Sequence, residues 1–352
     1  MVFNQSGRFI KEQFYIKGQA LEPVQSFCYL GFEVRPSGAM SHGASILLDK
    51  SLKALRPLQR AIANFQLPFD LSLRLFHALI EPIAMYNVEN WSILSNKQLD
   101  KLNAGTLLEF IGKTPIDTLH RKIRYTLGVN NSAPNLCLYG DTGEIPLSIK
   151  GFSLMVNFWH HLHSLPEDSL AYMALRENIS LRTNWLKTVE KFINILSLSE
   201  HVDDPLFKNI SKKNGKEIYR TKWNETLAAN EQSRLKFYKN IQEDFQTAAY
   251  IQLPYHQRKE IAKVRCSSHI LEIEKGIHKK EELKDRLCLM CSANAIEDEA
   301  HFISSCHAYN ALRTRHNYAN QTVQDIMLDR NQTNLSTFLK QCFKLRQKTL
   351  EP

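Results

Sequence analysis

One short segment of the chain contains four side chains of the kind that bind zinc. It reads CLMCSANAIEDEAHFISSC, with the spacing Cys288-x2-Cys291-x9-His301-x4-Cys306. Three thiolates and one imidazole match the ligand sets of tetrahedral structural zinc sites. Because four protein ligands leave no open position for water, the segment predicts a structural Zn²⁺ site. His307 could replace His301 as the nitrogen ligand. The alternative to a metal site is a redox-silent cysteine pair that has no relation to the His and the third Cys.

Two further clusters of polar residues are weaker candidates for chemistry. His160, His161 and His163, in FWHHLHSL, have no carboxylate or cysteine at a helpful spacing, which favours a helix surface or core edge. Asp203 and Asp204 stand between a helical pattern and a proline, which favours helix-end capping or a loop over a metal-binding carboxylate pair. The sequence has no phosphate-binding loop, dinucleotide fingerprint or nucleophile elbow. No catalytic residues are therefore predicted.

The charge of the chain favours a polyanionic partner. Lys and Arg number 45 against 36 Asp and Glu, a net charge of +9. Most of this surplus lies between Lys208 and Arg286. A local excess of basic residues is typical of surfaces that bind RNA or DNA. The alternative is a solvated surface with no such partner, which has the same composition. The residues expected to contact phosphates are Lys50, Lys53, Arg56, Arg60, Lys212, Lys213, Arg220, Lys263 and Arg265.

Aromatic residues are interleaved with this charge and allow two interpretations. Tyr219, Trp223, Phe237 and Tyr238 would stack on unpaired bases or, at their helical spacing, belong to the core. Seven scattered cysteines do not form a disulfide framework, which indicates a reducing compartment, nuclear or cytoplasmic. No stretch approaches the roughly 20 apolar residues of a membrane span, so no membrane partner is expected.

The elements that must position these residues follow from the hydrophobic pattern. Residues 1–40 carry short apolar runs broken by Gly and Pro, as strands do. From residue 45 the leucines recur every three or four positions, which indicates an amphipathic helix containing Pro57. A mainly α protein with a small N-terminal β region is predicted. Further helical patterns cover residues 70–80, 95–110 with a capping box at Ser95 and Gln98, and 185–196.

Six phrases occur in an order that resembles one family. They are MVFNQSGRF, QSFCYLGFEVRPSG, PIAMYNVENW, NLCLYGDTGEIPLSIKGFSLMVNFWHHL, KVRCSSHILEIEKG and the Cys/His segment with HAYNALR. Over nearly its whole length the chain resembles the C-terminal portion of LINE-type (non-LTR) retrotransposon reverse transcriptases. The resemblance implies a palm strand at MVFN and a primer-grip position at Tyr29, Leu30 and Gly31. It also implies four regions: the β remnant at 1–40, a thumb-like region at 41–147, a helical post-polymerase region at 148–260, and a zinc-knuckle region with a basic C-terminal helix at 261–352.

The sequence departs from that family in its carboxylates. The family's metal-binding aspartates lie upstream of the MVFN-like strand, and Asp203 and Asp204 stand on the wrong side of the primer grip. Without such carboxylates the Mg²⁺ ions of polymerases have no ligands. The expectation is a truncated, catalytically inactive protein that binds RNA or DNA through its basic surface. The alternative is a protein-interaction or structural zinc module with no nucleic-acid role, whose partner contacts the apolar residues around the ligands: Leu287, Leu289, Met290, Phe302 and Ile303.

Overall fold

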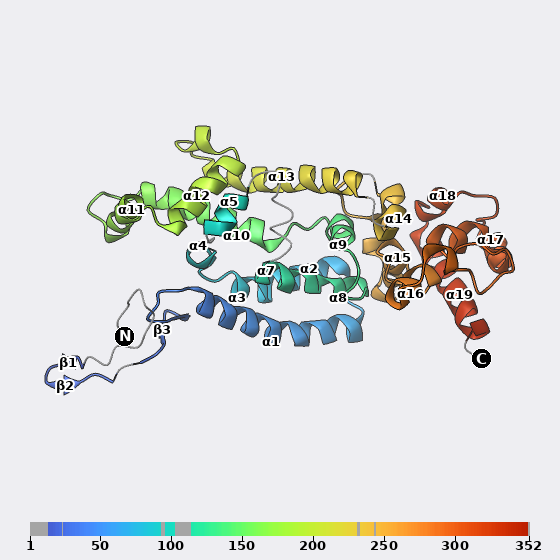
Figure 1. Ribbon diagram of the computed structural model, residues 1–352, viewed down its shortest axis with the longest axis horizontal. Coiled ribbons are helices and arrows are strands. Elements are labelled where there is room, and N and C mark those ends of the chain that lie inside the picture. The colour runs from blue at the N-terminus through green and yellow to red at the C-terminus, as the bar shows by residue number, and fades with distance from the viewer. Residues whose placement is uncertain are drawn as a thin grey trace. The chain divides into compact units, whose positions relative to one another are not determined.

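The protein is mainly helical, with two small antiparallel hairpins near its N-terminus (Figure 1). The computed structural model describes residues 13–22, 24–92, 96–102, 114–230, 233–242 and 244–350. The predicted fold class is confirmed. The MVFN strand, Ser95 of the expected capping box and the segment 103–110 lie outside the described residues. No helix in the described ranges is both long and apolar enough to cross a membrane.

The second hairpin is closed by a two-residue turn in which Gly31 favours the left-handed backbone conformation. Strand β1 (Tyr15–Ile16) pairs with β2 (Gln19–Ala20), and β3 (Phe27–Tyr29) pairs with β4 (Phe32–Val34). Leu30 and Gly31 connect β3 to β4 with φ values of 46° and 83°, the left-handed pair that a two-residue hairpin turn requires. Tyr29 and Leu30 are exposed, and the Tyr86 hydroxyl donates a hydrogen bond to the Leu30 carbonyl.

The predicted amphipathic helix forms as α1 (Ser41–Phe65), and it continues through Pro57. Its inward side chains recur every three or four residues, and its four candidate phosphate ligands are all exposed. At 3.6 residues per turn, Lys53, Arg56 and Arg60 lie roughly opposite the apolar stripe. The sequence therefore gives α1 one core face and one basic face. The buried apolar residues are Ala44, Leu47, Leu55, Leu58 and Ile62.

The chain forms two compact units. Unit 1 comprises residues 1–57, 75–120 and 146–218, and unit 2 comprises residues 58–74, 121–145 and 219–352, so that α1, α2 (Phe69–Leu79) and α13 (Phe207–Ala229) contribute to both. The four regions implied by the resemblance stay a prediction. In the described part of unit 1 the other helices are α3 (Glu81–Ala84), α4 (Val88–Trp91), α5 (Asn96–Lys101), α7 (Pro115–His120), α10 (Leu147–His163), α11 (Leu170–Leu181), α12 (Asn184–Ile195) and the 3-10 turn η2 (Ser199–His201).

Helix α10 organises unit 1, since it contacts α4, α7, α11 and α12. Its Phe152 stacks on Phe192 of α12, with ring centroids 3.8 Å apart. Its first turn is capped from α7, because the buried carboxylate of Asp117 accepts hydrogen bonds from the Ser148 backbone N–H at 3.0 Å and hydroxyl at 2.8 Å. Gly151 lets α4 approach closely, since a Cβ at this position would lie 3.1 Å from Val88 Cγ2.

A buried polar network lies in the core of unit 2. Asp141, which is fully buried, accepts hydrogen bonds from the hydroxyls of Tyr238 at 2.9 Å and Tyr250 at 2.6 Å and pairs with Arg265 at 2.8 Å. The remaining elements of this unit are η1 (Arg121–Ile123), α8 (Arg124–Leu127), α9 (Asn135–Thr142), α14 (Ser233–Ile241), η3 (Ala249–Gln252), α15 (Tyr255–Arg265), α16 (Glu272–Lys279), η4 (Leu283–Asp285), the π turn η5 (His301–Ser305), η6 (His307–Tyr309), α17 (Asn310–Arg315), α18 (Val323–Met327) and α19 (Gln332–Leu350).

The aromatic residues interleaved with basic charge belong to this core. Tyr219, Trp223, Phe237 and Tyr238 are all buried, and Trp223 donates a hydrogen bond from Nε1 to the Leu136 carbonyl at 2.9 Å. Their rings are therefore not available to stack on bases. Of the two interpretations of these aromatics, the core one is confirmed.

Candidate metal centre

The first two cysteines of the zinc-type segment lie on a tight loop between two short extended stretches. Leu287 and Ile296 form an antiparallel bridge, and the Cys288 backbone N–H donates to the Ala295 carbonyl at 2.8 Å. At the loop, the Met290 N–H points at Cys288 Sγ, 3.4 Å away. An N–H aimed at sulfur stabilises the thiolate form that a metal ion requires.

The other two candidate ligands lie at the ends of the π turn η5. The Cys306 backbone N–H donates to the His301 carbonyl at 2.8 Å, which closes the i→i+5 ring typical of π geometry. The His301 N–H is held by Asp298 Oδ1 at 2.7 Å. This wide turn explains why two ligands five positions apart face the same point.

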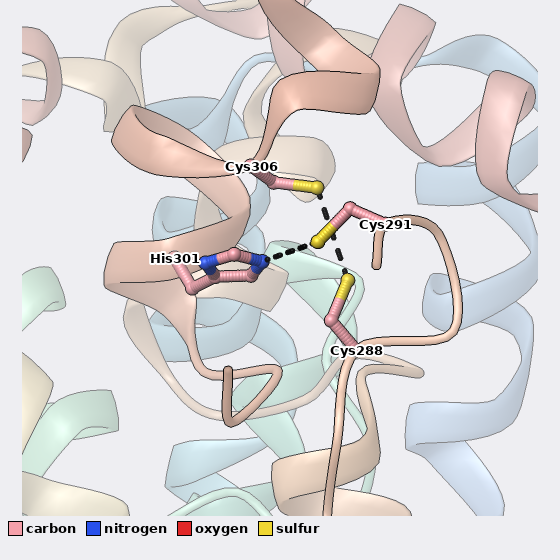
Figure 2. A group of neighbouring side chains, drawn as sticks. All are labelled: Cys288, Cys291, His301 and Cys306. Atoms are coloured by element: carbon pink, nitrogen blue, oxygen red, sulfur yellow. Dashed lines mark hydrogen bonds between the residues drawn. The ribbon is translucent and has the colours of Figure 1, made fainter. Parts of the chain in front are cut away.

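The four ligand atoms converge as a metal site requires (Figure 2). All of them lie within 4.8 Å of one another, with Cys288 Sγ and Cys306 Sγ 3.8 Å apart and Cys291 Sγ and His301 Nε2 3.4 Å apart. A tetrahedral zinc ion with bonds of about 2.3 Å to sulfur and about 2.0 Å to nitrogen sets two sulfurs about 3.8 Å apart, and a sulfur and a nitrogen about 3.5 Å apart. The group can therefore hold a metal ion of this size. His307, the alternative ligand, is exposed and outside the group.

Burial controls the protonation of the ligands when no metal is bound. It raises the pKa of the Cys288 thiol, raises that of Cys306 to about 12, and lowers the pKa of the His301 imidazole. The Ala293 backbone N–H, by contrast, lowers the pKa of Cys291. A neutral imidazole is ready to bind a metal, whereas Cys288 and Cys306 must release protons to do so.

The site is tied to the last helix of the chain through a buried ion pair. Glu297 Oε1 lies 4.0 Å from Cys288 Sγ, and Arg346 of α19 donates to both oxygens of Glu297, at 2.8 and 2.7 Å. Arg346 also pairs with Glu272 at 3.1 Å. A carboxylate beside a thiolate is unfavourable unless a cation balances it, so Arg346 supplies the charge that this site needs.

Sequence reasoning found the four ligands and missed these supporting residues. Glu297 stands within the ligand segment, but Arg346 is 49 residues further along the chain, with no local pattern to mark it. The second ring nitrogen of His301 lies 3.4 Å from Ser305 Oγ, which helps to orient the imidazole. Such contacts depend on tertiary structure.

No family model, curated protein or solved structure matches this chain. The resemblance to LINE-type reverse transcriptases therefore stays an expectation from the sequence. The structure itself places four ligand atoms in the geometry of a metal site.

The candidate phosphate ligands of α1, and Lys212 and Lys213 of α13, are accessible. Lys50, Arg56 and Arg60 are exposed, and Lys53 is exposed but pairs with Asp49 at 2.7 Å. This Lys53–Asp49 pair is largely solvated, so it contributes little to stability and leaves the amine free to exchange partners. On α13, Lys212 and Lys213 are exposed, without an ion-pair partner among the described residues. Both helices thus present basic side chains to solvent.

The candidates Arg220, Lys263 and Arg265 are more constrained. Arg220 pairs with Asp244, and its hydrogen bond holds the pKa of that carboxyl at about 2. Lys263, on α15, is half-buried and pairs with Glu260 at 3.3 Å. Arg265 is buried in its pair with Asp141, and the prediction that it contacts phosphates is wrong. Its charge is fully engaged with a buried carboxylate on another element.

The two weaker clusters take structural positions. His160 Nε2 lies 2.8 Å from the Val202 carbonyl, and its ring stacks on Phe207 with centroids 4.2 Å apart. Asp204 Oδ1 accepts from the Leu206 N–H at 2.7 Å, in the turn that precedes α13, which agrees with the loop position expected as one of the two alternatives for the aspartate pair. Among the described residues neither cluster forms a metal site.

Proposed function

We propose that this chain is a nucleic-acid-binding protein whose C-terminal part is stabilised by a structural zinc ion. The observation that carries the first half is a row of exposed lysines on α13. Lys208, Lys212 and Lys216 follow one another at intervals of four residues, with Lys213 beside them. None has an ion-pair partner within the described ranges, in contrast to Lys150, Lys263 and Lys284.

The spacing of this row, which we call the α13 lysine row (Lys208, Lys212, Lys213 and Lys216), suits a phosphate backbone. Successive members four residues apart are about 6 Å apart along the helix axis. Two phosphate steps along one strand of a duplex cover about 7 Å. A strand running along the helix would meet successive amines near alternate phosphates, which gives affinity without reading the sequence.

Zinc is the metal that the donor set favours. Three thiolates and an imidazole in a tetrahedral arrangement suit zinc far better than magnesium or calcium, which prefer oxygen ligands. With four protein ligands the ion would have no position for a reacting water. Its role would be to fix the loop, the turn η5 and, through Glu297, helix α19.

The resemblance to the region that follows the polymerase core of LINE-type reverse transcriptases supports the same function. The proposal is one of binding to RNA or DNA in the nucleus or cytoplasm, without polymerisation. The Tyr29–Gly31 turn, at the primer-grip position, is exposed and so accessible to a nucleic-acid strand.

The test combines metal analysis with binding at two salt concentrations. The full-length protein is expected to carry one zinc ion per chain and to bind labelled RNA and primer–template duplex with an affinity that falls steeply from 50 to 200 mM salt. Replacing Lys212 and Lys216 by Ala should lower the salt slope by about two. A matched control replaces Lys279 and Lys284, which are exposed but already paired with acidic residues.

The alternative, a zinc module that binds only protein, predicts a different result. It requires an apolar face on the metal centre, but Phe302 and Ile303 are fully buried, and Leu289 is the most exposed of the apolar residues around the ligands. If the folded, zinc-loaded protein binds no RNA or DNA at either salt concentration, the nucleic-acid proposal fails and the protein-binding module takes its place.

A further inference from the structure

A pocket of about 420 Å³ lies in unit 1 at the start of the α13 lysine row. Its volume is in the range of sites that hold a small organic ligand, roughly 300 to 1,000 Å³. It combines an aromatic ring with hydrogen-bond acceptors and basic groups. The lining residues that matter here are Glu89 from α4, Asn157, Phe158 and His161 from α10, Ser164 just after α10, and Lys208 from α13.

The walls of the pocket are held by contacts with neighbouring helices. Gly151 allows α4 to lie against α10, and Trp185 Nε1 donates to the Glu89 carbonyl at 2.8 Å. The start of α13 is held by the stacking of Phe207 on His160. Walls that are held in place before the ligand binds lower the ordering cost of binding.

Several polar groups of the pocket have no protein partner. The Asn157 Oδ1 atom is buried and accepts no hydrogen bond, and the Glu89 carboxylate has no partner in the described part of the chain. Lys208 likewise has no ion pair there. A buried acceptor without a donor is unfavourable. The ligand that fits would bring N–H donors for Glu89 and Asn157 and an anionic group for Lys208.

We propose that this pocket binds the guanine base of an unpaired nucleotide in the strand that follows the α13 lysine row. Guanine presents two neighbouring N–H donors on its Watson–Crick edge, which match the two oxygens of a carboxylate such as Glu89. Phe158 and His161 offer rings on which the base can stack. Lys208 would meet the attached phosphate. This inference rests on the proposed nucleic-acid function and gives it a base preference.

The experiment measures binding of the full-length protein to labelled single-stranded RNA in which one central position varies. The oligonucleotides are otherwise uridine and carry guanine, cytosine or an abasic site at that position. The wild-type protein should bind the guanine strand about tenfold more tightly than the abasic strand. Glu89→Gln should remove the guanine preference, so that the guanine and abasic strands bind with equal affinity. Glu217→Gln, which removes an exposed carboxylate of α13 away from the pocket, is the matched control.

The outcomes separate this inference from the function on which it rests. Equal binding of all strands by the wild-type protein would overturn the pocket assignment while leaving phosphate binding intact, and so would a guanine preference that survives in Glu89→Gln. If no strand binds, the nucleic-acid function fails. Titration with GMP, followed by NMR, then decides the pocket alone: binding that Glu89→Gln abolishes supports it, and no binding overturns it.

Discussion

Replacing Arg346 by Met tests whether α19 supports the metal centre. The guanidinium is 2% exposed and pairs with Glu297, whose side chain is 1% exposed. Met fills a similar volume but leaves the Glu297 carboxylate buried without its cation. Breaking a buried pair in this way costs roughly 3–5 kcal/mol of folding free energy. The midpoint of urea unfolding should fall accordingly.

The same substitution should weaken zinc binding. Glu297 Oε1 lies 4.0 Å from Cys288 Sγ, and two like charges at 4 Å repel by about 4 kcal/mol at an effective dielectric constant of 20. We expect the zinc dissociation constant to rise 10- to 100-fold, the usual effect of losing a residue that supports a metal ligand.

The assay is competition for zinc with a chromophoric chelator at pH 7.5. Lys344→Met, on the same helix but exposed, is the control for loss of charge and should leave the affinity unchanged. Adding Glu297→Gln to Arg346→Met should recover part of the affinity, because it removes the unbalanced charge. If Arg346→Met binds zinc as tightly as the wild-type protein, or the double variant recovers nothing, the electrostatic reasoning is wrong.

Three further predictions follow from the site and the core. Cys306→Ser should lower the zinc content measured by mass spectrometry, whereas His307→Ala should leave it at one ion per chain; loss in both would refute the ligand assignment. Zinc affinity should fall as the pH is lowered from 8 to 6, because the Cys288 and Cys306 thiols, whose pKa values burial raises, must lose protons to bind; a flat profile in chelator competition would contradict this. Arg265→Leu should destabilise the protein by roughly 3–5 kcal/mol in urea unfolding, because it leaves the Asp141 carboxylate buried without its cation. It should not change the salt dependence of RNA binding. A change in the slope of that salt dependence would show that Arg265 does contact phosphates.

The patterns that the sequence predicted well are local ones. Helix α1 follows from leucines at helical spacing, and the metal ligands follow from cysteine and histidine spacing within one segment. The choice between His301 and His307 could not be made from spacing, because it depends on the π turn that brings His301 to the side of Cys306. The backbone hydrogen bond of this turn joins residues five apart, whereas that of an α-helix joins residues four apart, and this difference cannot be read from the spacing of the ligands.

The prediction for Arg265 was wrong because it assumed that a charged side chain is exposed to solvent. Arg265 counts as basic in any composition, but its partner Asp141 lies 124 residues earlier in the chain. Arg258 is likewise fully buried and donates to the Thr126 carbonyl at 2.7 Å. Part of the basic surplus between residues 208 and 286 is thus internal. The α13 lysine row is the part that remains on the surface.

The order of the four ligands along the chain has a consequence for proteolysis. Cys288 and Cys291 precede the exposed loop residues Ser292 to Asn294, and His301 and Cys306 follow them. A protease that cuts this loop leaves two ligands on each fragment, so a bound ion would act as a crosslink between the new ends. The nicked protein should then stay in one piece until a chelator is added.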